Sequence, residues 1–195
     1  MHPSHRCGFL AQAYTREGFD LSRHPLSLLS NGELGWLQIA NFVVAGLLIL
    51  GFAAGVRRAT HPGRAGTWGP WLLRGFGAGL IAAGVFVADP AYGYPPGTPS
   101  GMPDQLSWHS VLHGVAAVGS FLSLVAACVV FARRFAGRRQ RGWMWYSLTT
   151  GVVALLLSAW SGEAASITLF VAAAVGFAWV AALATRLWAE LTGAR

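Results

Sequence analysis

Three ionisable side chains fall at the ends of two neighbouring apolar runs, where they could bind a metal or move a proton. Asp89 ends one run, and His109 and His113 lie four residues apart at the start of the next. Ionisable groups within a membrane are costly, so they are usually paired or functional. Residues four apart share one face of a helix, so both imidazoles are expected to point into the protein rather than toward lipid.

Two histidines on one helix face and a carboxylate from a neighbouring helix could hold zinc with one position open for water. Asp89, His109 and His113 are therefore candidate metal ligands, with Glu33 or His24 as general base or as the partner of a ligand. Two other interpretations stay open. The cluster is either structural, with Asp89 accepting from His109 or capping the loop, or it relays a proton or holds a ligand.

A polar stripe on the first apolar run could extend this site. Gln38, Asn41 and Ala45 share one helix face, and Glu33 lies just above it. Amides at such positions often join helices through hydrogen bonds worth about 1 kcal/mol each, and otherwise they would form one wall of an outer pocket. The residues of the predicted ligand pocket are His24, Glu33, Gln38, Asn41, Asp89, His109 and His113.

The composition places these residues in a membrane protein. Of the 195 residues, 54% are hydrophobic and 11% are charged, against roughly 25% charged in a soluble domain. A membrane-crossing helix needs about 20 mostly apolar residues. The stretches that meet this length are Trp36 to Val56, Pro70 to Asp89, Ser107 to Ala132, Gly142 to Ser161 and Ser166 to Trp188. The sequence therefore predicts an all-α transmembrane bundle over residues 36–188, after a polar segment 1–35 and before a tail 189–195.

The basic residues predict the orientation of this bundle in the plasma membrane, because arginine and lysine are retained on the cytoplasmic side. All 14 basic residues are arginine, and most lie in the loops 57–69 and 133–141 or near the carboxyl end. The loops 90–106 and 162–165 contain none. We therefore expect a cytoplasmic carboxyl terminus, an outward amino-terminal segment and a lipid bilayer as the main partner. The net charge of +7 does not indicate nucleic-acid binding, because no basic helix accompanies it.

Other residues predict interfaces and helix contacts. Most of the nine tryptophans fall at predicted span ends, as indoles do at membrane interfaces. Gly75, Gly79 and Ala83 recur every four residues, as do Gly51 and Gly55, a spacing that lets helix backbones approach closely. The proline- and tyrosine-rich loop 90–106 joins the ends that carry Asp89 and His109, and it is expected to arch over the site.

Three segments resemble one family. They are 24–42 (HPLSLLSNGELGWLQIANF), 84–90 (GVFVADP) and 108–113 (WHSVLH), and they resemble the domain-of-unknown-function 998 family (DUF998) of bacterial integral membrane proteins. The resemblance covers about Gly18 to Ala132 strongly and the last two spans loosely, and the arginine- and alanine-rich style resembles actinobacterial members. The resemblance implies no assigned reaction. Family members usually have a sixth span ahead of this region, of which Cys7 to Ala13 would be the remnant, and six spans would put the amino terminus inside.

A more distant similarity is to the alkaline ceramidases and the progestin and adipoQ receptors, which use Ser, Asp and several His around zinc. Ser30, Asp89, His109 and His113 supply these residue types here, although the late His pair of that group is absent. Ser30, and Glu33 as general base, are therefore the candidate catalytic residues. The main expectation is a multi-pass membrane protein with an outward-facing polar pocket for a small ligand, a lipid headgroup or an ion. The alternatives are a zinc-dependent hydrolase of lipid amides or esters and a structural or partner-binding subunit, so whether the protein is an enzyme stays open.

Overall fold

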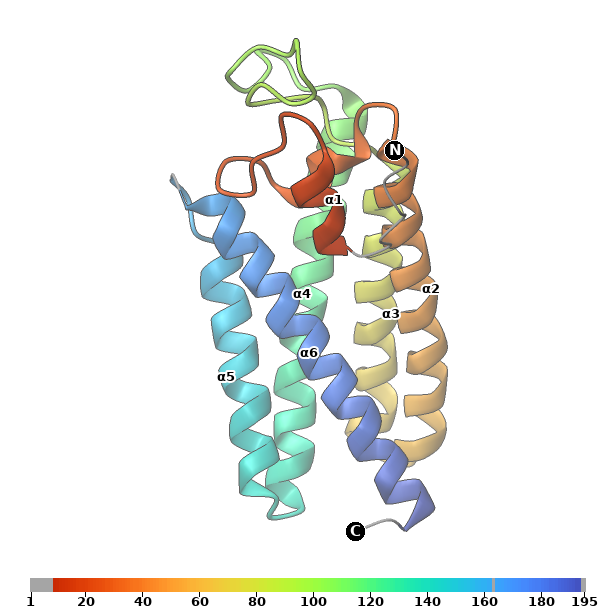
Figure 1. Ribbon diagram of the computed structural model, residues 1–195. Helices are drawn as coiled ribbons and strands as arrows, with labels where there is room; N and C mark the ends of the chain where they lie inside the picture. The colour runs from red at the N-terminus through yellow and green to blue at the C-terminus, as the bar shows by residue number, and fades with distance from the viewer. Residues whose placement is uncertain (1–8, 163, 194–195) are drawn as a thin grey trace.

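The computed structural model describes residues 9–162 and 164–193, and it is helical throughout apart from its loops. Five long helices lie side by side (Figure 1): α2 (Gly35–Thr60), α3 (Arg64–Val85), α4 (Trp108–Gly137), α5 (Arg141–Ser158) and α6 (Ala165–Thr192). The short helix α1 (Phe9–Thr15) and the 3-10 helix η1 (Leu26–Ser30) lie at one end of the bundle, the capped end. This confirms the predicted all-α class.

Three of these helices, α2, α4 and α6, are long and apolar enough to cross a membrane. Helices α3 and α5 lie alongside them but do not meet the same criterion of length and apolar composition, so the number of five spans stays a prediction. The predicted run Pro70 to Asp89 differs most from its helix, because α3 begins at Arg64 and ends at Val85. Pro90 disfavours a helical conformation in the residue before it, which is consistent with the early end of α3 and leaves Asp89 in the connecting segment.

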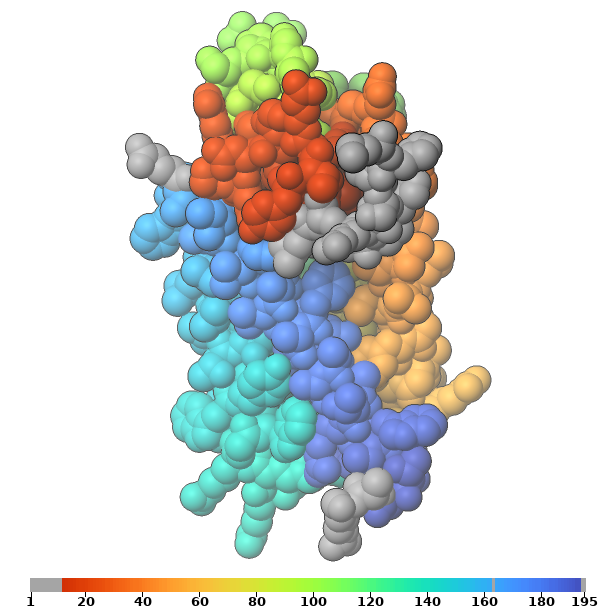
Figure 2. All heavy atoms as spheres, in the orientation of Figure 1, coloured from red at the N-terminus to blue at the C-terminus, as the bar shows by residue number. Residues whose placement is uncertain are grey.

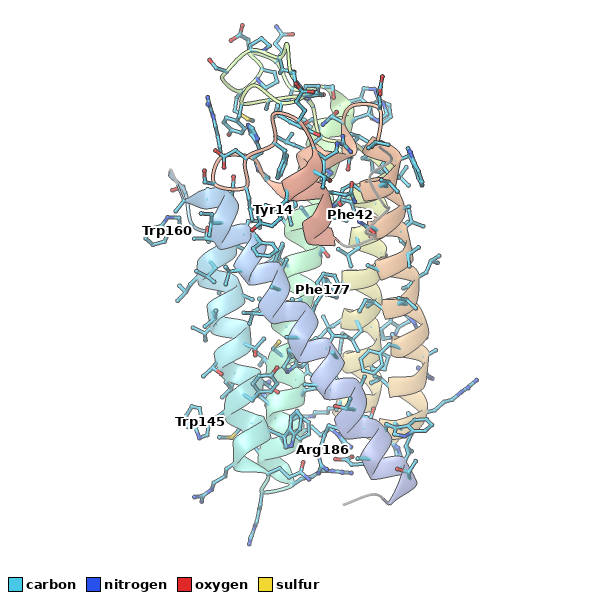
Figure 3. The ribbon with its side chains drawn as sticks, viewed as in Figure 1. Tyr14, Phe42, Trp145, Trp160, Phe177 and Arg186 are labelled. Carbon is cyan, nitrogen blue, oxygen red and sulfur yellow. The ribbon has the colours of Figure 1, made fainter. Side chains whose placement is uncertain are left out.

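Consecutive long helices pack against each other, and α6 runs obliquely across the bundle (Figure 1). At the end opposite the cap, α6 packs through Trp179, Leu183 and Leu187 into a core with residues of α2, α3 and α4. The Trp179 indole donates a hydrogen bond to Ser147 Oγ at 3.0 Å and packs edge-on against Phe131. Trp145 and Trp160 instead project outward from the α5 region, near its two ends (Figure 3). Trp179 therefore contributes to the packing of the bundle rather than to its surface.

Small residues bring α3 close to both of its neighbours. A Cβ atom on Gly46 of α2 would lie 2.6 Å from the carbonyl oxygen of Gly77. On the other face of α3, a Cβ on Gly75 or Gly79 would meet Ser123 or Ser120 of α4 at 2.7 Å. The predicted contacts of Gly75 and Gly79 are thus confirmed. Among the described residues, no atom lies within 4 Å of a Cβ placed on Gly51 or Gly55, so neither mediates a helix contact within this part of the chain.

The end opposite the cap, the arginine end, is joined by ion pairs that the sequence did not predict. Glu190 of α6 accepts hydrogen bonds from Arg134 at 2.7 Å and from Arg138 at 3.0 Å, and it pairs with Arg186 at 3.4 Å. The Arg134 side chain is only 9% exposed. The arginines that predict orientation therefore also tie the end of α4 to the end of α6.

The cap combines two segments that are distant in sequence, the amino-terminal residues 12–34 and the loop 90–106, which Figure 2 shows packed on one another. Leu28, Leu29, Ala91 and Tyr94 form its own small apolar core. Asn31 Nδ2 donates to the carbonyl oxygen of Ala88 at 3.1 Å, which ties the cap to the segment after α3. The cap therefore holds together through its own contacts as well as those to the bundle.

Candidate functional site

A cavity of about 600 Å³ lies in the capped half of the bundle, between α2, α3, α4 and α6. Because α6 is oblique, it closes on the core at the arginine end and leaves this space nearer the cap (Figure 1). Leu26 and Ser27 of η1 line its capped end, and Phe76, Leu124 and Phe177 line the end toward the core. The volume is in the range of small-molecule sites, roughly 300–1,000 Å³.

The walls of this cavity are mainly apolar, and one side reaches the surface of the bundle. Val44 and Leu48 of α2 and Phe177 of α6 line the cavity and are also exposed. The cavity therefore opens sideways between α2 and α6, where a bilayer would lie around a membrane protein. Its polar lining residues come from several elements and are Ser27, Gln38, Asn41, His113, Ser120 and Ser166.

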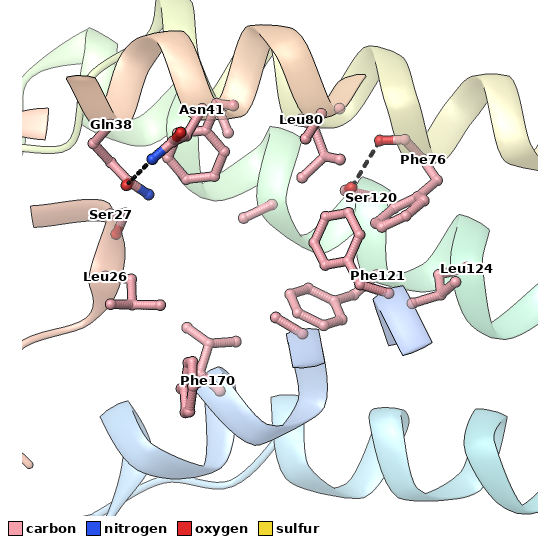
Figure 4. Close-up of a pocket in the computed structure, with 18 of the residues that line it drawn as sticks. Leu26, Ser27, Gln38, Asn41, Phe76, Leu80, Ser120, Phe121, Leu124 and Phe170 are labelled. Carbon is pink, nitrogen blue, oxygen red and sulfur yellow. Dashed lines mark hydrogen bonds between the residues drawn. The ribbon is translucent and has the colours of Figure 1, made fainter. Parts of the chain in front are cut away.

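Gln38 and Asn41 lie together on α2 at the capped end of the cavity (Figure 4). Asn41 Nδ2 donates to Gln38 Oε1 at 3.3 Å. Gln38 is 1% exposed, and its Nε2 has no hydrogen-bond partner among the described residues. A buried amide donor without a partner costs free energy, and a hydrogen bond to a bound molecule would offset that cost. This N–H group is therefore a candidate contact for a ligand. Both amides thus line this cavity, and their role in a binding site stays a prediction.

His113 lines the same cavity and is held by the end of α3. Its Nδ1 lies 2.9 Å from the carbonyl oxygens of both Ala83 and Phe86. Carbonyl oxygens only accept, so Nδ1 must carry a proton, and a neutral ring then leaves Nε2 as a hydrogen-bond acceptor. Within residues 9–162 and 164–193, Nε2 has no hydrogen-bond partner. The fixed tautomer therefore gives this apolar cavity an acceptor.

Two other polar lining groups already donate to backbone carbonyls. Ser120 Oγ donates to Phe76 at 3.0 Å (Figure 4), and Ser166 Oγ donates to Arg23 at 2.9 Å. The first bond joins α4 to α3, and the second joins the start of α6 to the cap. These two hydroxyls have structural roles, whereas Gln38 Nε2 and His113 Nε2 do not bond another described residue.

Asp89 has a structural place outside the cavity lining. Its carboxylate accepts hydrogen bonds from Ser107 Oγ at 2.6 Å and from the Ser107 backbone amide at 2.7 Å. Its own amide donates to Ser110 Oγ at 3.2 Å. Ser107 is the N-cap of α4, so Asp89 fixes the segment after α3 to the start of α4. This arrangement corresponds to the loop-capping alternative, and Asp89 is not among the residues that line the cavity.

The Ser107 hydroxyl lowers the pKa of Asp89 from its ordinary value of 3.8, with further lowering from the Ser107 amide and Ser110. A carboxylate with a lowered folded-state pKa stabilises the fold above its unfolded pKa, and that contribution is lost as the pH falls through the folded pKa. We expect Asp89→Asn to have a lower melting temperature than wild type at about pH 6. The difference between the two melting temperatures should become smaller below about pH 3, where the wild-type carboxylate is protonated. Asp104→Asn, at an exposed carboxyl, is the control. A pH-independent difference would contradict the assignment.

His109 does not share the environment of His113. It is exposed, and its ring stacks on Trp108 with centroids 3.6 Å apart. The two histidines differ in their position along α4 relative to the end of α3. His109 lies in the first turn of α4, whereas His113 bonds the carbonyl oxygens of Ala83, in the last turn of α3, and of Phe86, the residue after α3. In the described part of the chain, no three His, Cys, Asp or Glu side chains gather as a metal site would require. The predicted ligand set Asp89, His109 and His113 is therefore not assembled.

The remaining predicted site residues also lie outside the cavity lining. His24 is buried in the cap, where Nδ1 accepts from the Asp20 amide at 2.9 Å and Nε2 donates to the Tyr92 carbonyl at 3.0 Å. Glu33 is exposed, and Ser30 is buried with no partner for its hydroxyl among the described residues. The candidate catalytic residues Ser30 and Glu33 and the pocket residue His24 are thus not brought together with His113 around the cavity.

Long apolar helices packed around a cavity define a helical membrane protein. The chain matches the family described as protein of unknown function (DUF998) over residues 7–186. Because this match covers most of the chain, the protein belongs to that family, which confirms the resemblance seen in the sequence. No curated protein and no solved structure matches the chain.

Proposed function

We propose that the protein binds a small lipophilic molecule in the cavity of its capped half. The observation that carries this proposal is the apolar cavity of about 600 Å³ that opens sideways between α2 and α6. In a bilayer, such an opening gives lipid-soluble molecules access without passage through water. Apolar walls with a few polar groups are typical of ligand sites. The mainly apolar lining favours a lipophilic occupant over the ion or headgroup that the sequence suggested.

We also propose that the capped end faces outward and the arginine end faces the cytoplasm. The distribution of arginine supports this orientation, since the loops 57–69 and 133–141 lie at the arginine end and the arginine-free loops lie at the capped end. The cavity would then lie in the outer half of the plasma membrane. A zinc-dependent hydrolase receives no support from the geometry of Asp89, His109 and His113. A purely structural or partner-binding subunit is the alternative outcome of the test below.

The proposal predicts that filling the cavity prevents binding. Ala173 of α6 lines the cavity, whereas Ala181 on the same helix is exposed and does not. We expect Ala173→Phe to reduce photolabelling of the cavity residues by an uncharged alkyl diazirine by roughly tenfold, a difference of about 1.4 kcal/mol in binding. Ala181→Phe, the matched control, should leave this labelling unchanged. Mass spectrometry of labelled peptides from the purified protein measures both.

Two results would contradict ligand binding. One is labelling spread evenly over the lipid-facing surface of wild type, with no excess at the lining residues of α2 and α6. The other is equal labelling of the lining residues in both variants. Either result, with unchanged melting temperatures, would leave a structural or partner-binding role as the better explanation.

A further inference from the structure

Two polar atoms of the cavity lining are complementary in type. Gln38 Nε2 is a hydrogen-bond donor, and in the neutral His113 ring Nε2 is an acceptor, because Nδ1 donates to the end of α3. Neither atom has a hydrogen-bond partner within the described part of the chain. A hydroxyl group donates once and accepts twice, so it matches both types of atom.

Charge restricts the occupant further. None of the described residues that line the cavity is an Asp, Glu, Lys or Arg. An ionised group placed there would lose its hydration without gaining a counter-charge, which is far more costly than burying a hydroxyl with hydrogen-bond partners. A phosphate, sulfate or ammonium headgroup therefore does not fit this end of the cavity.

The depth of the polar end also fits an amphiphile. Gln38 lies in the first turns of α2, next to the exposed Trp36, and the lining residues from Phe42 to Leu48 continue toward the middle of the bundle. Figure 4 shows Ser27, Gln38 and Asn41 at one end of the cavity and Phe76, Phe121 and Leu124 at the other. A polar group near Gln38 would thus lie close to the membrane interface, with its chain directed toward the bilayer centre.

We propose that the cavity selects an uncharged amphiphile whose polar end both donates and accepts hydrogen bonds, as a long-chain alcohol does. This inference rests on the proposed function and specifies the class of ligand. Gln38 Nε2 donates to the ligand oxygen, and the ligand hydroxyl donates to His113 Nε2. The alkyl chain occupies the apolar space toward Phe76 and Leu124.

The test compares diazirine probes of one chain length that end in a hydroxyl, a methyl ether or a sulfate. We expect the alcohol to label the cavity residues at least roughly a hundredfold more efficiently than the sulfate, because the sulfate must bury a charge. The methyl ether accepts but cannot donate, so it should bind about fivefold more weakly than the alcohol. Peptide mapping by mass spectrometry restricts the comparison to labelling of the cavity.

Two variants test the assigned atoms. Gln38→Leu removes the donor at similar volume. His113→Asn keeps an N–H donor for Ala83 and Phe86 but has no acceptor at the position of Nε2, because the amide oxygen Oδ1 takes the place of the ring Cδ2, nearer the backbone. We expect each to weaken alcohol binding by about fivefold, and His113→Asn to abolish the preference for the alcohol over the ether. Gln140→Leu is the matched control, because Gln140 also has a buried amide atom without a partner among the described residues but lies outside the cavity. It should bind like wild type.

The outcomes separate the two proposals. If no probe labels the cavity above the lipid-facing surface, the proposed function fails. If all three probes label it equally, or the sulfate labels it best, the cavity binds lipophiles but the selection of a hydroxyl is wrong. Unchanged alcohol binding in both Gln38→Leu and His113→Asn, with melting temperatures like wild type, also overturns the selection.

Discussion

Gly46→Ala is expected to lower the free energy of unfolding by about 3 kcal/mol, the upper part of the range for overpacking a close contact. The added methyl group would lie 2.6 Å from the Gly77 carbonyl oxygen and 2.5 Å from Ile81 Cγ1. The isoleucine side chain can move, but the carbonyl belongs to the backbone of α3. The two helices must therefore separate, and the tight packing that holds membrane helices together is lost.

The same substitution on the opposite face of α2 gives the control. A Cβ atom on Gly51 would meet no atom of the described residues within 4 Å, and alanine favours a helix over glycine by up to about 1 kcal/mol. Gly51→Ala should thus be neutral or stabilising. Unfolding in mixed detergent and dodecyl sulfate micelles measures both variants. Equal effects at the two positions would contradict the close approach of α2 and α3.

Glu190→Gln is expected to destabilise the protein by about 2 kcal/mol, between the range for exposed ion pairs and the range for breaking a buried one. Arg134 is 9% exposed and would lose its carboxylate partner at 2.7 Å. Glutamine keeps the shape of the side chain, so the loss reports the charge. Glu17→Gln, on an exposed residue of the amino-terminal segment, is the matched control and should have little effect.

Double-mutant cycles can divide this effect between the arginines. Arg138 is 50% exposed and bonds the same carboxylate oxygen at 3.0 Å. Pairs in water contribute roughly 0–1 kcal/mol, so the coupling of Arg138 to Glu190 should be well below that of Arg134 to Glu190. Equal couplings would mean that burial does not set the strength of the cluster.

The helices were readable from the sequence because apolar length and arginine-rich loops delimit them directly. The sequence did not show that the two histidines would lie in different environments, although they are four residues apart on one helix. A spacing of four places residues on one face but does not specify how far the neighbouring helix extends, and α3 ends below the level of His109. His113 meets that end, whereas His109 stacks on Trp108. Helix length thus decided which histidine reached the cavity.

The cavity itself was predicted only in part. Gln38, Asn41 and His113 were assigned to a pocket, but the place of the cavity follows from the oblique course of α6, which no periodicity in the sequence encodes. His24 was assigned to the pocket because it is an ionisable residue near the first span. One of its hydrogen-bond partners, the Tyr92 carbonyl, lies 68 residues away in the sequence. A hydrogen bond between two such distant segments depends on the geometry of the loops. Glu190 carried a usable signal, as an acidic residue near several arginines at one membrane face.

The bonds of the cap impose an order on biosynthesis. His24 cannot pair with Tyr92 until α3 has been made, and the Arg23 carbonyl cannot accept from Ser166, 143 residues later, until α6 begins to emerge. Contacts of such large sequence separation form late, since closing the intervening loop costs entropy. The wall that α6 provides is also the last to be translated. Until α6 packs, the space between α2, α3 and α4 is therefore open to the surrounding lipid, and a hydrophobic occupant can be enclosed when α6 closes it.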